Sequence, residues 1–132
     1  MTETRFRDRS AVSIENEVLR VTVLKEGGHI AEVFDKRAGV SPLWIPRWDS
    51  REPSTFSQSI REEYGSGVDA KLLAGIMGHN LCLDIFGGPS REEAKAGLGV
   101  HGEASVDTYI IEADASGLRM GLTLRLAQLR LS

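Results

Sequence analysis

Residues 18–34 read VLRVTVLKEGGHIAEVF, and this stretch decides the fold of the chain. Its two halves, residues 18–24 and 29–34, are rich in β-branched and aliphatic side chains, which is typical of strands. Gly27 and Gly28 between them are residues that allow the chain to reverse. The stretch therefore predicts an antiparallel hairpin whose loop is longer than two residues.

Upstream of the hairpin, residues 12–14 predict a short strand, so the chain is expected to open as a meander. Residues 1–10 are polar and contain Arg5, Arg7 and Arg9 at alternate positions. Charged residues near a chain end are usually solvated, and we expect residues 1–10 to be a flexible N-terminal arm. A phosphate contact by these arginines is the alternative interpretation.

The last third of the sequence has the clearest periodicity. Residues 104–111 are strand-like, and beyond residues 114–117 apolar and polar residues alternate strictly, which predicts a second strand with one apolar face. The alternation shifts phase near Ala127 and Gln128, and this indicates a β-bulge. The apolar positions are Leu118, Met120, Leu122, Leu124 and Leu126, and after the shift Leu129 and Leu131. Because this pattern runs into the last residue without a turn or cap, we expect the sequence to be a fragment of a longer chain.

The middle of the chain is less regular. Residues 41–46 predict a short extended segment, and residues 47–67 predict a polar surface excursion with a helical turn at 59–64. An excursion of that length is uncommon unless it is functional. Residues 71–78 fit a helix or a strand, and residues 80–86 predict an extended segment that ends at a Gly-Gly-Pro turn.

Ser90 and Glu93 have the spacing of a capping box, which predicts a short helix at Arg91–Ala96 that ends at Gly97. Apart from this helix, the helical turn at 59–64 and the ambiguous residues 71–78, the expected regular elements are strands. The expected fold class is therefore all-β and antiparallel, with one or two short helical turns. After the N-terminal arm, residues 11–132 are expected to form a single β-rich domain.

Composition limits the classes of function. The chain has 132 residues, 41% of them hydrophobic and 27% charged, which is ordinary for a globular domain. The net charge of -3 and the scattered basic residues do not predict a nucleic-acid partner. No apolar run has the length of a membrane span, residues 1–10 are too polar for a secretory signal, and Cys82 is the single cysteine. We therefore expect no membrane partner and a cytoplasmic location.

The segment Gly97-Leu98-Gly99-Val100-His101-Gly102-Glu103 places an imidazole and a carboxylate beside glycines, which let a ligand approach closely. The polar residues that strand ends and glycine turns would deliver nearby suit hydroxyl-rich ligands, because Asn and His supply both donors and acceptors. Trp44 and Trp48 could close one end of the core or form a platform for a sugar face. The expected ligand-binding residues are His101, Asn80, His79, Glu103 and Trp48.

Other chemistries are not supported by the spacing of their residues. His79, Cys82 and Asp84 could be read as a metal cluster, but residues 79 and 82 of an extended strand point to opposite faces. Gly87-Gly88-Pro89 lacks the Lys of a phosphate-binding loop, and no Gly-x-Ser-x-Gly elbow occurs. We expect neither a metal nor a cofactor.

Two segments resemble the aldose 1-epimerase (galactose mutarotase-like) superfamily. These are residues 14–23 (IENEVLRVTV) with the following Gly27-Gly28-His29-Ile30, and the segment Gly99-Val100-His101-Gly102-Glu103. The resemblance implies that the chain is the N-terminal half of a large β-sandwich. It also implies that His101 matches the first substrate-contacting His of the superfamily, while His79-Asn80 stands where typical members have an Asn-Arg pair.

The superfamily interconverts sugar anomers: a carboxylate base removes the anomeric proton and a His acid protonates the ring oxygen. The resemblance implies that both catalytic groups lie beyond residue 132, so no residue of this chain is expected to be catalytic. The expected function is that of the carbohydrate-binding portion of an isomerase of this kind. The alternative is a small non-catalytic β-domain for protein association or sugar binding. In either case homodimers are expected through exposed sheet edges, specifically through residues 118–126.

Overall fold

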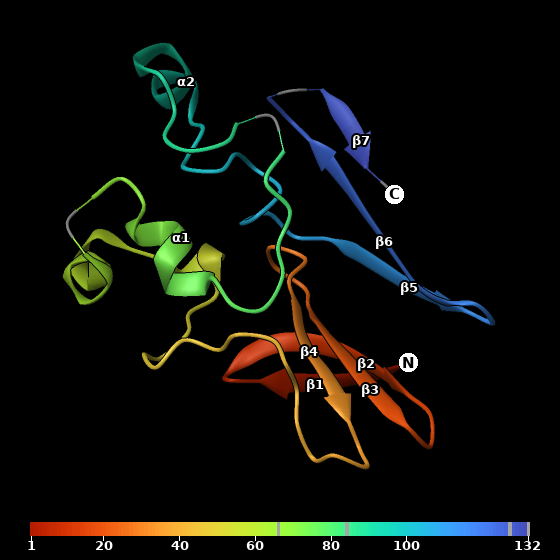
Figure 1. The fold of residues 1–132 in the computed structure, drawn as a ribbon. Helices are drawn as coiled ribbons and strands as arrows, with labels where there is room; N and C mark the ends of the chain where they lie inside the picture. Colours follow the sequence, from red (N-terminus) through yellow and green to blue (C-terminus); the bar gives the residue numbers. More distant parts are fainter. Residues whose placement is uncertain (66, 84, 127, 132) are drawn as a thin grey trace.

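The computed structural model describes residues 1–65, 67–83, 85–126 and 128–131, and it contains two antiparallel sheets with a few short helices (Figure 1). The first sheet has four strands in sequence order, and the second has three. This arrangement confirms the expected β-rich antiparallel fold class. The first sheet comprises β1 (Thr2–Phe6), β2 (Arg9–Glu15), β3 (Leu19–Leu24) and β4 (Ile30–Asp35), and the second β5 (Ile110–Asp114), β6 (Gly117–Leu124) and β7 (Leu129–Leu131).

The hairpin expected in residues 18–34 is confirmed as β3 and β4. Its loop needs both glycines, because Gly27 and Gly28 have φ angles of +78° and +59° and lie against other parts of the chain. A Cβ at Gly27 would lie 2.5 Å from the backbone oxygen of Ser105, and one at Gly28 would lie 2.6 Å from the Tyr109 ring. The turn is therefore shaped by its contact with the second half of the chain.

The flexible arm expected for residues 1–10 is wrong. Residues 2–6 form β1, which pairs along its whole length with β2. The two strands are joined by Arg7 and Asp8, which have φ angles of +49° and +62°, as tight two-residue hairpin turns require. β1 has no apolar period in the sequence, because its residues are polar and mostly exposed, as an edge strand permits.

The strand expected from the alternation after residue 117 is confirmed as β6. The β-bulge is wrong in kind, because Leu129 and Leu131 belong to β7, which folds back on β6 with Leu124 opposite Leu129 and Leu122 opposite Leu131. The phase shift marks a chain reversal. Ala127 lies outside the described residues. Because β6 is paired on both sides, the dimer contact expected through residues 118–126 has no free edge there, and the edges of this sheet are β5 and β7.

The other strand predictions hold only in part. The strand expected at 104–111 begins at Ile110, and residues 104–107 form turns in which the Glu103 carbonyl accepts hydrogen bonds from the amides of Val106 and Asp107. Within residues 80–83, 85 and 86 the structure has no strand. The expected extended segment at 41–46 likewise forms a loop.

The short helices agree with the capping signal and with the irregular middle of the chain. They are η1 (Pro53–Thr55), η2 (Gln58–Tyr64), α1 (Ala70–Gly75) and α2 (Arg91–Ala96). In α2 the Ser90 hydroxyl accepts from the Glu93 amide at 3.2 Å, and the Glu93 carboxylate accepts from the Ser90 amide at 2.7 Å. The capping box and the stop at Gly97, with φ +100°, are confirmed.

The two sheets meet where the loop between β3 and β4 touches the segment before β5. The Gly27 amide donates to the Asp107 carbonyl at 2.7 Å, and the Tyr109 amide donates to the Lys25 carbonyl at 2.9 Å. An isolated bridge between Glu26 and Thr108 lies between these bonds. Apolar clusters pack on both sides of this junction, one around Ala11, Leu24, Ala31 and Met77, the other around Ala104, Tyr109, Leu122 and Leu124.

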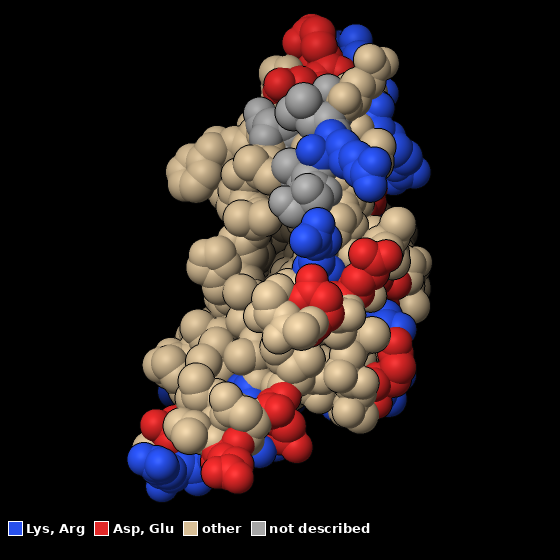
Figure 2. Space-filling view, turned by 90° about the vertical axis from the view of Figure 1, so that its right-hand side faces the viewer, with Lys and Arg blue, Asp and Glu red and all other residues tan. Residues whose placement is uncertain are grey.

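Charged side chains of both signs are interspersed over the side of the molecule shown in Figure 2. Lys and Arg side chains are most concentrated in the upper half of that view. Within the described part of the chain, no helix is long and apolar enough to cross a membrane.

Candidate functional site

His101 is held by the segment that precedes α2. Its backbone amide donates to the Gly87 carbonyl at 2.9 Å, and its Nδ1 accepts from the Gly87 amide at 3.2 Å. His101 itself has a φ angle of +62°, a conformation that is uncommon outside glycine. These contacts fix residues 87 and 101 side by side, although they are fourteen positions apart in the sequence.

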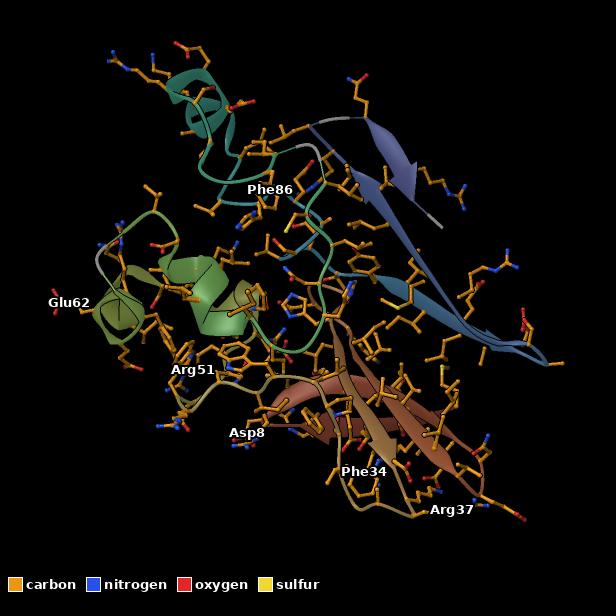
Figure 3. The ribbon with its side chains drawn as sticks, in the orientation of Figure 1. Asp8, Phe34, Arg37, Arg51, Glu62 and Phe86 are labelled. Atoms are coloured by element: carbon orange, nitrogen blue, oxygen red, sulfur yellow. The ribbon has the colours of Figure 1, made fainter. Side chains whose placement is uncertain are left out.

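The His101 ring is packed edge-on against Phe86, with 5.3 Å between the ring centroids and 64° between the ring planes. Phe86 is 90% exposed, and it projects from the loop between α1 and α2 (Figure 3). The aromatic residue expected at the site from the sequence was Trp48, not Phe86. The signal that could have found it is an aromatic residue placed directly before Gly87-Gly88-Pro89, where a turn exposes what precedes it.

The hydrogen bond at Nδ1 selects the tautomer of a neutral His101 ring. A neutral imidazole carries one proton, and Nδ1 accepts from the Gly87 amide, so the proton lies on Nε2. The ring can therefore donate a hydrogen bond from Nε2 beside the exposed Phe86. An aromatic face next to a polar donor is a combination suited to a sugar, which has both apolar C–H faces and hydroxyl groups.

Glu103 is buried and is occupied by contacts within the protein. It is 7% exposed, its carboxylate accepts from the Leu126 amide at 2.9 Å, and it lies 3.8 Å from the Arg125 Nε. It therefore holds the end of β6 to the loop that follows α2. The structure does not place it beside the His101 ring as a second binding group.

His79 and Asn80 follow α1 in the sequence, and His79 lies beside Ile30, the first residue of β4. The His79 backbone pairs with Ile30 through hydrogen bonds of 2.9 and 3.0 Å, and its side chain is exposed. Asn80 is half-buried, and its amide nitrogen is buried without a hydrogen-bond partner in the described structure. Among the described residues, no hydrogen bond, ion pair or ring contact joins either side chain to His101 or Glu103.

Trp48 lies against α1. Its indole nitrogen donates to the Leu73 carbonyl at 2.9 Å, and its ring meets Trp44 in a T-shaped contact with centroids 5.7 Å apart. Trp44 and Trp48 are 52% and 41% exposed, so the pair closes the edge of the helical part without being buried in it. No ring contact joins either indole to Phe86 or His101 in the part of the chain that the structure describes.

A cleft of about 440 Å³ is lined by residues of the glycine-rich segment, but not by His101. Gly99, Gly102 and Glu103 line one wall, Lys71 and Leu72 of α1 line another, and Arg125 and Leu126 close it. Of the five residues expected to bind ligand, Glu103 is the one that lines this cleft. The segment thus divides its residues between a cleft and the His101–Phe86 surface.

His29 is buried between the two halves of the chain and is part of the structural framework. Burial lowers the pKa of His29 to about 4, although its hydrogen bond to the Ser105 carbonyl opposes the shift. The described residues hold no group of three or more His, Cys, Asp or Glu side chains that could bind a metal ion. Asp84, part of the sequence pattern considered for a metal, lies outside the described residues.

Comparison with known proteins found no matching family model, no matching curated protein and no matching solved structure. The interpretation of the site therefore depends on its own geometry and chemistry.

Proposed function

We propose that this chain binds carbohydrate through Phe86 and His101. The observation that carries the proposal is the contact between a 90% exposed phenyl ring and an imidazole whose Nδ1 is engaged by the Gly87 amide. The phenyl ring would stack on the apolar face of a pyranose, and the His101 Nε2–H would donate to a ring or exocyclic oxygen.

The backbone beside these rings leaves room for such a ligand. A Cβ placed at Gly87 or Gly88 would meet no atom within 4 Å, so the surface next to Phe86 is open. A polar group can approach this backbone closely because no side chain covers it.

The resemblance to the aldose 1-epimerase superfamily supports the same substrate class and assigns His101 the role of a substrate-contacting residue. In this proposal the two sheets are the beginning of a galactose mutarotase-like β-sandwich. In this proposal the chain itself binds sugar without catalysing its conversion. Glu103 is engaged by Leu126 and Arg125, and no other carboxylate contacts His101 in the described structure. Loss of a catalytic acid or base costs roughly 10² to 10⁴ in rate for each group.

An NMR titration tests the proposal. Galactose and glucose are added to isotopically labelled protein while the His101 ring and Phe86 amide signals are followed. We expect saturable shifts of both, and a Phe86→Ala variant should weaken binding by roughly tenfold because it removes the stacking surface. Trp44→Ala removes an exposed aromatic ring outside the site and is the matched control. Absence of shifts with every aldose, or an equal loss in both variants, would overturn the proposal.

Protein association is a second candidate function, and the exposed surface of the molecule favours it. The accessible surface is 8146 Å², whereas a compact monomer of 14.4 kDa exposes roughly 6,800 Å². The outer strands are β1 and β4 in the first sheet and β5 and β7 in the second. β4 is covered at its two ends by bridges to His79 and Val40, and the unpaired parts of such edges can bond to other chains. Sedimentation over a hundredfold concentration range tests this, and a monomer throughout would exclude self-association.

A further inference from the structure

The second sheet carries a groove of about 700 Å³ that is separate from the His101–Phe86 surface. The strand register places the polar and charged strand residues that line it on one face of the sheet, since Glu112 lies opposite Arg119, and Thr123 lies opposite Arg130. Met120, Leu122 and Leu124 alternate with them along β6 and pack into the apolar cluster behind the sheet. The groove therefore lies on the outer face, on the side away from the core.

Gly121 gives the groove its depth. It lies between Arg119 and Thr123 on the same face of β6, opposite Ile110 of β5, and it has no side chain. The side chains of Arg119 and Thr123 on either side of this glycine leave a hollow over its backbone. A small ligand group could settle there between the guanidinium groups.

The charges of the groove are not balanced. Arg125 is paired with Asp107 at 3.0 Å and lies 3.8 Å from Glu103. Arg119 and Arg130 form no ion pair or side-chain hydrogen bond in the part of the chain that the structure describes. Glu112, opposite Arg119, is the one carboxylate lining the groove that has no cation within ion-pair distance among the described residues. Two guanidinium groups thus face this single free carboxylate.

We propose that this groove binds the oxyanion of a phosphorylated or carboxylated small molecule. A guanidinium presents its donors in a planar fork that matches two oxygens of a phosphate or carboxylate, and Arg119 and Arg130 reach the groove from neighbouring strands. The Thr123 hydroxyl, next to Arg130, adds a neutral donor. The inference is independent of the proposed sugar surface, because none of the groove residues contacts Phe86 or His101 in the described structure.

Inorganic phosphate is the first probe. It is titrated into ¹⁵N-labelled protein at constant ionic strength, with chloride replaced by phosphate, while the side-chain Nε–Hε signals of Arg119 and Arg130 are followed. We expect both signals to shift with one saturable curve. Arg119→Gln and Arg130→Gln should each weaken binding by roughly tenfold, because each removes charge-assisted hydrogen bonds. Shifts that rise linearly without saturation would overturn the proposal.

Two further variants keep the test decisive. Arg37→Gln is the matched control, since Arg37 lies at the far end of the first sheet (Figure 3), and it should leave phosphate binding unchanged. Glu112→Gln removes the negative charge opposite Arg119. It should therefore tighten phosphate binding severalfold, because this charge competes with the anion for the guanidinium group. If Arg37→Gln weakens binding as much as Arg119→Gln, or if Glu112→Gln has no effect, the groove is not the binding site.

Three ligands then separate the possible sources of the oxyanion. Glucose 6-phosphate carries a phosphate, glucuronate carries a carboxylate, and glucose carries neither. Either charged ligand should shift the Arg119 and Arg130 signals, and glucose should not. Shifts of the His101 signals with glucose would support the sugar surface. Absence of shifts at Arg119 and Arg130 with both charged ligands would overturn the groove proposal, so the two proposals can fail separately.

Discussion

The His29 Nε2 lies 3.0 Å from the backbone oxygen of Ser105, and this contact ties the loop between β3 and β4 to the segment that leads into β5. The Nδ1 of the same ring accepts from the Met77 amide at 3.3 Å, so Nε2 carries the proton and donates to Ser105. One neutral imidazole thus connects three segments that are far apart in the sequence. His29 is fully buried, and each of its ring nitrogens has a partner.

The unfolding free energy should fall as the pH is lowered and His29 becomes protonated. Its pKa is about 4 in the folded protein, below the 6.5 of an unperturbed histidine, so between these values the unfolded chain binds a proton that the folded chain does not. The His29 contribution is therefore fully present above pH 6.5 and is lost as the pH falls towards 4. We expect a loss of about 2.5 kcal/mol between pH 7 and pH 4.5.

Urea unfolding at both pH values measures this effect. His29→Gln has no titrating ring, so its difference in unfolding free energy between the two pH values should be smaller than that of the natural sequence by that amount. Carboxylates contribute equally to both proteins and cancel. An identical pH dependence in the two proteins would contradict the assignment.

Arg9 should be among the residues most costly to replace. It is completely buried, and its guanidinium donates to the Glu52 carboxylate at 2.8 Å, to the Gly75 carbonyl at 2.7 Å and to the Glu26 carbonyl at 2.9 Å. Arg9→Met leaves a partly buried carboxylate and two carbonyls without their partner, which should cost about 3 to 5 kcal/mol in unfolding free energy.

Chemical denaturation of three variants checks the Arg9 prediction. Arg37→Met, at an exposed position, should change the unfolding free energy by less than about 0.5 kcal/mol. Combining Arg9→Met with Glu52→Leu should recover part of the loss, because the uncompensated carboxylate is removed as well. If Arg9→Met changes the unfolding free energy as little as Arg37→Met does, the hydrogen bonds of buried Arg9 do not stabilise the fold.

Two glycines with similar backbone angles should respond differently to alanine. Gly39 and Gly78 have φ angles of +70° and +59°, but a Cβ meets nothing within 4 Å at Gly39 and would lie 2.0 Å from the Ile30 carbonyl oxygen at Gly78. Gly39→Ala should cost about 1 kcal/mol from the backbone conformation alone. Gly78→Ala adds a backbone collision and should cost at least about 3 kcal/mol. Similar thermal midpoints for the two variants would contradict the packing of residue 78 against β4.

Substitution of Glu103 should mainly change the unfolding free energy, and substitution of His101 should mainly change ligand binding. Glu103→Ala removes the acceptor of the Leu126 amide and should lower the unfolding free energy by about 1 to 3 kcal/mol. Glu103→Gln keeps an oxygen acceptor and should recover part of that loss. His101→Ala should abolish the aldose-induced shifts at Phe86 with a smaller effect on unfolding. Loss of aldose binding in Glu103→Gln with unchanged stability would reverse these two roles.

Local pattern predicted most of the regular structure. The β3–β4 hairpin, the alternation of β6 and the capping box of α2 each depend on residues within one element, so the sequence could reveal them. β1 escaped because a polar edge strand lacks an apolar period, and β7 escaped because a chain reversal and a bulge both shift the phase of alternation. His101 stands out in the sequence and Phe86 does not, and a ligand-binding role for either residue remains a proposal.

By itself the sequence determined the β3–β4 hairpin, the strand β6 and the capped helix α2, because these elements follow from side-chain period, from glycine in a tight loop and from a local capping box. Only the tertiary structure decided which distant residues meet. It buried Arg9 against Glu52, 43 residues away, and placed Phe86 beside His101. It also assigned Glu103 to the Leu126 amide. The physical reason is that period and propensity act within an element, whereas burial and pairing of charges depend on the path of the whole chain.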